Sequence, residues 1–263
     1  MKKKPANATK PVWVVKIGSG LLTAENGQLD AGSVRRLVGE VVAVRDRVDV
    51  VLVSSAAIAS GMRVLRRKRR PTTMEELQAC SAIGQPKLIA TYEEALAAHG
   101  LHVAQILLTY FDLDSRSLRV NAKRTLQRLL ALGKVVPVIN ENDTVSYEEI
   151  KFGDNDQLSA HVAALIGAER LVILSNVPGL TRHNGRGRVI RRVRRIDAQI
   201  EALAGGTESQ RSVGGMVSKL KAARIAATAG VPTQIAHGAR PGILDAICQG
   251  RQVGTQFELT PEA

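Results

Sequence analysis

Short runs rich in Val, Ile and Leu alternate with helical patterns along most of the chain. Six such runs predict strands, over residues 12–17, 49–53, 102–107, 135–139, 171–174 and 232–236. Helical patterns cover about 31–45, 72–82, 86–98, 117–132 and 216–229, further helices begin near 55 and 155, and residues 185–187 suggest a hairpin tip. This alternation predicts an α/β fold, an αβα sandwich around a mostly parallel, open, doubly wound sheet.

The composition suits such a sheet, because hydrophobic residues make up 44% of the 263 residues and aromatic residues only 3%. Cys80 and Cys248 are too few for a disulfide framework and lack metal-ligand spacing, which indicates a reducing compartment. Lys16 and Gly18 interrupt the apolar stretch behind the basic start of the chain, so we expect no signal peptide. No window approaches the roughly 18 apolar residues of a membrane span. We therefore expect a cytoplasmic protein without membrane contact.

The net charge of +13 raises the question of nucleic-acid binding. The excess is concentrated in residues 63–70, with six basic residues in eight, and in residues 182–195, with seven arginines. Neither run interleaves the aromatic residues on which single-stranded nucleic acids stack. We interpret both runs mainly as solvated faces, with a field that attracts ATP and carboxylates as the alternative. No nucleic-acid partner is expected.

Polar residues follow four of the predicted strands at the point where each strand ends. They occupy positions 16–20, 54–56, 140–143 and 175–176. At a single strand end, Gly and Ser are ordinary turn residues. Ligands of open parallel sheets, however, bind beyond the carboxyl ends of the strands. Because four such ends meet along one edge, the sequence predicts the functional site there.

Two lysines and a carboxylate stand out at that edge. Lys16 ends a strand beside glycines, although a snorkelling lysine would look the same. Lys219 follows Gly214 and Gly215 into a helix, where free amides and the helix dipole favour an anion, unless the lysine simply faces solvent. An acidic N-cap explains one carboxylate of residues 153–156, but not two aspartates and an asparagine together.

A carboxylate of this segment, placed between two lysines, would hold both ammonium groups where phosphoryl transfer needs positive charge. The chain has no Walker motif, no protein-kinase signature and no GxGxxG fingerprint. Nor does it have a GxSxG elbow or an HExxH helix. The phosphate site is therefore of another type.

Three segments resemble the amino-acid kinase family in order and spacing: VVKIGS at 14–19, VSSAAIASG at 53–61 and GGMVSK at 214–219. The paired segments VINENDTV at 138–145 and FGDNDQLSA at 152–160 resemble the glutamate 5-kinases of that family. The resemblance implies a kinase domain over residues 12–257, a flexible segment over 1–11 and a tail over 258–263. It also implies a short form without the RNA-binding-like PUA domain that many members carry at the C-terminus.

The resemblance implies transfer of the ATP γ-phosphoryl group to the side-chain carboxylate of L-glutamate, which gives L-glutamyl 5-phosphate for proline biosynthesis. Mg²⁺ would bridge the ATP phosphates, proline would act as a feedback inhibitor, and the chain would form a homo-oligomer, either a dimer or a tetramer. The implied roles are glutamate binding by Ser55, Asp143 and Asn155, catalysis by Lys16, Lys219 and the lysine-orienting Asp156, and nucleotide binding by Lys16, Ser175, Asn176, Val213, Gly214, Gly215, Met216, Val217, Ser218 and Lys219.

Three positions depart from the family pattern, because Ala56 replaces a usual Gly, Asn176 an Asp and Val213 a Thr. Three alternatives to glutamate phosphorylation stay open. One is a sister kinase acting on N-acetylglutamate, aspartate, carbamate or a nucleoside monophosphate. Another is a catalytically dead ligand sensor of the same fold. The charge leaves a basic nucleic-acid-binding protein as a third.

Overall fold

The computed structural model describes residues 10–145, 155–183, 186–205 and 215–258. The helices and strands are, in chain order, β1 (Val12–Ile17), α1 (Ser19–Leu22), α2 (Ala31–Val44), β2 (Asp49–Ser54), α3 (Ala57–Val64), α4 (Met74–Ala97), β3 (His102–Leu108), α5 (Tyr110–Asp114), α6 (Arg116–Ala131), β4 (Val135–Glu141), α7 (Asn155–Ile166), β5 (Arg170–Ser175), β6 (Thr181–His183), β7 (Arg186–Val189), β8 (Arg192–Val193), α8 (Ala198–Ala204), α9 (Met216–Thr228), β9 (Thr233–His237), α10 (Ile243–Cys248) and β10 (Thr255–Phe257).

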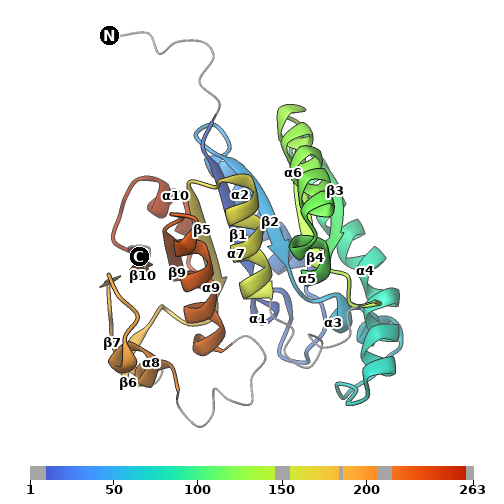
Figure 1. Cartoon of the computed structure of the whole chain (residues 1–263). Coiled ribbons are helices and arrows are strands. Elements are labelled where there is room, and N and C mark those ends of the chain that lie inside the picture. The colour runs from blue at the N-terminus through green and yellow to red at the C-terminus, as the bar shows by residue number, and fades with distance from the viewer. Residues whose placement is uncertain (1–9, 146–154, 184–185, 206–214, 259–263) are drawn as a thin grey trace.

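One sheet contains strands in the order β3-β4-β2-β1-β5-β9-β10-β8, with helices on both of its faces (Figure 1). Every neighbouring pair from β3 to β9 is parallel, whereas β10 runs antiparallel to β9 and pairs in parallel with β8. From β1 the chain continues to β2 on one side and later returns to β5 on the other. The predicted open, mostly parallel, doubly wound sheet is confirmed. Its switch point, where such folds bind ligands, lies at the carboxyl end of β1.

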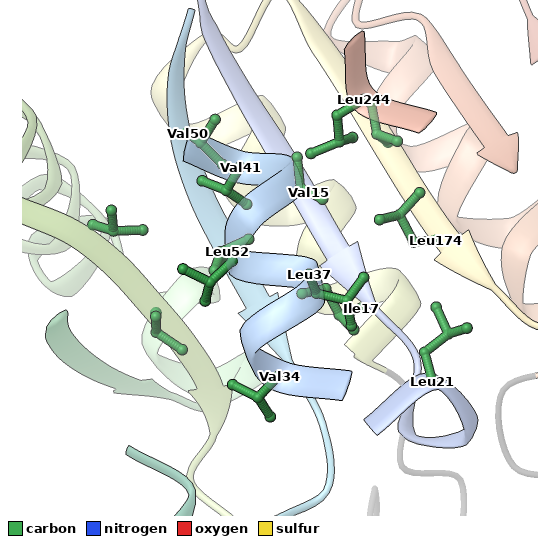
Figure 2. Close-up of a cluster of buried hydrophobic side chains, with 14 of the residues drawn as sticks. Val15, Ile17, Leu21, Val34, Leu37, Val41, Val50, Leu52, Leu174 and Leu244 are labelled. Atoms are coloured by element: carbon green, nitrogen blue, oxygen red, sulfur yellow. The ribbon is translucent and has the colours of Figure 1, made fainter. Parts of the chain in front are cut away.

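The alternation of side chains along β1 separates two apolar layers. Val15 and Ile17 pack in the layer formed with α2, α4 and α10, and Figure 2 shows them among its side chains. Val14 packs in the opposite layer, with α7 and α9. Because successive side chains of a strand point to opposite faces, Lys16 lies on the face of Val14. The strand therefore directs its one charged side chain toward α7 and α9.

The predicted break between residues 82 and 86 is wrong, because α4 continues through Pro86. Proline in a helix interior removes the hydrogen bond to the carbonyl four residues earlier, here that of Ala82. Both residues are exposed, so water can solvate that carbonyl. Close packing of α4 on α3 also maintains the helix, since a Cβ on Gly84 would lie 1.9 Å from the carbonyl oxygen of Ala57.

Both basic runs lie at the surface, as interpreted from the sequence. All six basic side chains of residues 63–70 are exposed, and Arg67 forms an ion pair of 2.8 Å with Glu76. The second run accompanies the antiparallel pair β6–β7, in agreement with the predicted hairpin, although residues 184 and 185 lie outside the described residues. Its arginines with described side chains are all exposed, namely Arg182, Arg188, Arg191, Arg192, Arg194 and Arg195. None of the described helices is long and apolar enough to cross a membrane.

Candidate active site

The carboxyl ends of β1, β2, β4 and β5 meet beside the first turns of α7 and α9. This convergence follows from the parallel pairing of the four strands. The loop after β1 is joined to the end of β5, because the Gly18 amide donates to the Leu174 carbonyl at 3.1 Å. The polar segments predicted to share one edge therefore do so.

Lys16, Asp156 and Lys219 form a buried ion-pair cluster between β1, α7 and α9. The Lys16 ammonium nitrogen lies 2.6 Å from Asp156 Oδ1, and that of Lys219 lies 3.0 Å from Asp156 Oδ2. The three residues are only 5%, 0% and 3% exposed, so this is no surface contact. Ser218, beside Lys219 in the first turn of α9, donates to Asp156 Oδ2 at 3.2 Å. The predicted arrangement of a carboxylate between two lysines is present.

The electrostatics of this cluster favour an anionic ligand. Burial would raise the pKa of Asp156, but the ammonium groups of Lys16 and Lys219 outweigh burial and lower it, so the carboxyl group is ionised. Two ammonium groups therefore lie together in a place shielded from water, where they interact strongly with an anion. A phosphoryl group is an anion of this kind.

Asn155, the neighbour of Asp156 in α7, faces the ends of β2 and β4. Its Nδ2 donates to the Ser54 carbonyl at 3.2 Å, to Ser55 Oγ at 2.9 Å and to Asn140 Oδ1 at 3.0 Å. Asn155 and Asp156 therefore use adjacent positions of one helical turn for two different purposes. Asn155 binds the strand ends where the phosphoryl acceptor is predicted to bind, and Asp156 binds the two lysines.

Asp143 lies in the loop after β4 and accepts a short hydrogen bond from the Ser81 hydroxyl of α4. Burial raises the pKa of Asp143, while the Ser81 hydrogen bond and the charge of Arg70 oppose that rise. Arg70 is the last residue of the first basic run, so one end of that run acts on a predicted acceptor-binding residue. Within the described part of the chain, Asp143 forms no hydrogen bond with Ser55 or Asn155.

The predicted nucleotide-binding residues lie in two places. Ser175 ends β5, and its hydroxyl donates to Asn176 Oδ1 at 3.3 Å. Asn176 is exposed and faces Gly20 of α1, where an added Cβ would lie 3.5 Å from Asn176 Nδ2. The other place is the start of α9, with Gly215 as N-cap, Met216, Val217, Ser218 and Lys219. Val213 and Gly214 lie outside the described residues.

Ala56 occupies a conformation that explains why glycine would suit the position. It precedes α3 with φ of 87°, in the left-handed region. A Cβ in that region costs roughly 1–2 kcal/mol. The chain therefore carries local strain directly beside Ser55.

Sequence reasoning did not assign functional roles to four residues that surround this site. Ser54 ends β2, and Asn140 lies one residue before the end of β4; both bind Asn155. Ser81 and Gln85 come from α4. Ser81 and Gln85 are four positions apart, hence on one helical face. Two polar residues at that spacing were the signal in the sequence that could have indicated their role.

The donor set suits a metal ion that arrives with ATP. The described residues contain no group of three or more His, Cys, Asp or Glu side chains that could bind a metal. Both carboxylate oxygens of Asp156 already face lysine ammonium groups. Mg²⁺ commonly binds through substrate phosphates together with few protein ligands, and the lysines here would contact the same phosphates.

Known proteins share this sequence and fold. The amino acid kinase family matches residues 11–237. A glutamate 5-kinase of Pseudomonas putida is 46% identical over 100% of this chain and 70% of its own length, and one of Thermus thermophilus is 50% identical over 93% of this chain and 66% of its own. A UMP kinase of Bacillus anthracis has the same fold, with a TM-score of 0.58 at 15% identity over 96% of this chain and 97% of its own. The chain therefore belongs to the amino acid kinase family.

Proposed function

We propose that this protein transfers the γ-phosphoryl group of ATP to the side-chain carboxylate of L-glutamate, forming L-glutamyl 5-phosphate in the first step of proline biosynthesis. The similarity to glutamate 5-kinases, over 93–100% of this chain and 66–70% of their own length, supports this substrate. The observation that carries the chemistry is the buried Asp156, which holds Lys16 and Lys219 at 2.6 and 3.0 Å. Neither lysine is among the three positions that depart from the family pattern, so those departures do not argue for an inactive sensor.

In the proposed reaction, the two lysines neutralise the transferring phosphoryl group. Charge spreads over its oxygens in the transition state, where fixed ammonium groups stabilise it more than in the ground state. Mg²⁺, bound to the ATP phosphates, would supply further positive charge. Asp156 is a positioning residue, which holds both ammonium groups in place. The acceptor carboxylate is already ionised at neutral pH, so the reaction needs no general base.

The acceptor and nucleotide would approach this cluster from opposite sides. We assign glutamate binding to Ser55, Asp143 and Asn155, because Asn155 links the ends of β2 and β4 directly beside Asp156. The nucleotide is assigned to the end of β5 and the start of α9, together with Lys16. Its residues are Ser175, Asn176, Val213, Gly214, Gly215, Met216, Val217, Ser218 and Lys219.

A coupled assay of ADP formation tests this function. We expect ADP release to require ATP, glutamate and Mg²⁺ together, and removal of the metal with EDTA to abolish it. ADP release that is independent of any acceptor would indicate only an ATPase. A protein that binds ATP or proline without turnover would instead be a ligand sensor.

Proline is expected to inhibit by competing with glutamate, through the loop that follows Asp143. The loop includes residues outside the described part of the chain, so this prediction rests on the similarity to glutamate 5-kinases. Added proline should raise the apparent KM for glutamate and leave kcat unchanged. Initial rates measured with and without millimolar proline at subsaturating glutamate check this. Equal rates would contradict the prediction.

Residues 12–257 would form the kinase domain and self-associate as a dimer or tetramer, and the protein would work in the cytoplasm. The sheet runs from Val12 in β1 to Phe257 in β10, which supports a domain with these limits.

A further inference from the structure

Helix α4 presents a row of buried polar side chains to the acceptor site. Ser81, Gln85 and Tyr92 are 3%, 8% and 0% exposed. Their separations of four and seven residues place them on one face of a helix. An entirely apolar face would have sufficed for packing, so this polar row requires an explanation.

Two members of this row contact the end of β4, and the third contacts the end of β2. Ser81 donates to Asp143 after β4, and Gln85 Oε1 accepts from Asn140 Nδ2 at 2.8 Å. The Tyr92 hydroxyl lies 2.9 Å from Ser54 Oγ at the end of β2. One helix therefore contacts both strands whose ends carry the proposed glutamate-binding residues.

Close packing holds this helix against α3, which begins two residues after Ser55. A Cβ on Gly61 of α3 would lie 1.8 Å from the Cys80 carbonyl oxygen, and one on Gly84 would lie 1.9 Å from that of Ala57. At such distances the two helices cannot approach further or tolerate side chains between them. The polar row is thus part of a rigid support.

Backbone groups determine the direction of the amides that follow. The Glu141 amide donates to Asn140 Oδ1 at 2.9 Å, so Asn140 must direct its Nδ2 at Gln85. The Ser54 carbonyl can only accept, so Asn155 must direct its Nδ2 at that carbonyl and at Asn140 Oδ1. Each amide therefore donates to the next one. Asn155 donates to Asn140, and Asn140 donates to Gln85.

One buried acceptor remains at the end of this chain of amides. Within the described part of the structure, Asn155 Oδ1 is buried and has no hydrogen-bond partner. Such a group costs free energy until a donor reaches it. At neutral pH the only donor group of glutamate is its α-ammonium group, because both carboxylates are ionised.

We propose that Gln85 and Ser81 are positioning residues for glutamate, the phosphoryl acceptor. Gln85 orients Asn155 through Asn140, so that Asn155 Oδ1 receives the α-ammonium group of glutamate. Ser81 holds Asp143 in its binding position. The proposal rests on the function proposed above and names residues that act through others. Replacing either residue is expected to weaken glutamate binding selectively, because neither residue touches the lysine cluster.

The first test replaces Gln85 with Met, which keeps length and removes the amide acceptor. Loss of that acceptor leaves Asn140 Nδ2 unpaired, and we expect KM for glutamate to rise on the order of tenfold. KM for ATP and kcat should change little. Gln85→Glu keeps an acceptor oxygen and should restore much of the affinity. Gln127→Met, at an exposed position of α6, is the matched control.

Glutarate, which lacks the ammonium group, separates positioning from a general packing role. As a competitive inhibitor it should bind the wild type and the Gln85→Met variant equally well, because it cannot use Asn155 Oδ1 as an acceptor. A general packing defect would instead weaken glutamate and glutarate alike. Equal weakening of both, or an unchanged KM for glutamate, would overturn the assignment of Gln85.

Ser81→Ala provides an independent readout through pH. Binding of an ammonium group needs ionised Asp143, whose pKa burial raises and the Ser81 hydroxyl and Arg70 lower. Without the hydroxyl the pKa should rise further, so kcat/KM for glutamate should decline at a higher pH on the acid side. Gln85→Met should leave the acid limb of the pH profile of kcat/KM unchanged. An unshifted limb in a folded Ser81→Ala protein would overturn the assignment of Ser81.

Calorimetric titration of glutamate in the absence of turnover distinguishes failure of this proposal from failure of the function. Wild-type protein that binds and phosphorylates glutamate, with variants that bind it equally well, would refute only the positioning roles. Wild-type protein that binds no glutamate would refute both. Weaker glutamate binding by the variants supports positioning whatever the turnover rate.

Discussion

Replacing Lys219 with Met is expected to lower kcat by about 10²–10³, the usual effect of removing one electrostatic donor to a transition state. Lys219 is 3% exposed and its ammonium nitrogen lies 3.0 Å from Asp156 Oδ2, so this group is held in place before the substrates arrive. Glutamate binding should remain, because Ser55, Asp143 and Asn155 are unchanged. Steady-state kinetics with varied glutamate, together with thermal denaturation, would measure both effects.

Lys221→Met is the matched control for this variant. Lys221 lies two residues further along α9 and is exposed, so its replacement removes a lysine from the same helix but not from the cluster. The control should keep normal kcat. A folded Lys219→Met protein within a few-fold of wild-type kcat would rule out the proposed role of the lysine.

The second large effect is expected from Asp156→Asn, which removes the carboxylate between two buried lysines. Breaking a buried ion pair from one side costs about 3–5 kcal/mol, because the remaining charge is left without compensation. The free energy of unfolding and kcat should both fall. ATP should stabilise this variant more than the wild type, since the phosphates replace the missing negative charge.

If Asp156 were only an acidic residue at a helix start, Asp156→Asn would lower the free energy of unfolding by a smaller amount. Asp30, whose side chain caps α2 through Gly32 and Ser33, serves as the control, because Asn caps about as well as Asp. Asp30→Asn should be nearly neutral. Combining Asp156→Asn with Lys219→Met should cost less in kcat than the two single losses together, because the residues act as a unit. Additive losses would show that they act separately.

The strand ends of the site could be predicted because they obey rules of the chain alone. Parallel strands place their carboxyl ends on one edge, so Lys16 and the polar residues after β2, β4 and β5 had to meet. The alternation of β1 also assigns Lys16 to a face once its apolar neighbours are known. Charge indicated a carboxylate between the two lysines, and the resemblance to the amino-acid kinase family assigned that role to Asp156.

The contribution of α4 could not be predicted in the same way. Pro86 indicated two helices, whereas packing of Gly84 against α3 keeps one. Only a continuous helix places Ser81, Gln85 and Tyr92 in one row. Short elements such as α1, α10 and β8 contain too few residues to show a hydrophobic period, and tertiary contacts determine them.

The most direct test of the account is trapping of the acyl phosphate with hydroxylamine, using wild-type protein, MgATP and a panel of acids. An acyl phosphate reacts to give a hydroxamate, so the assay identifies the carboxylate that receives the phosphoryl group. We expect kcat/KM to be far higher for glutamate than for aspartate or N-acetylglutamate. Hydroxamate yields with either of those acids that equal or exceed the yield with glutamate would contradict the proposed substrate.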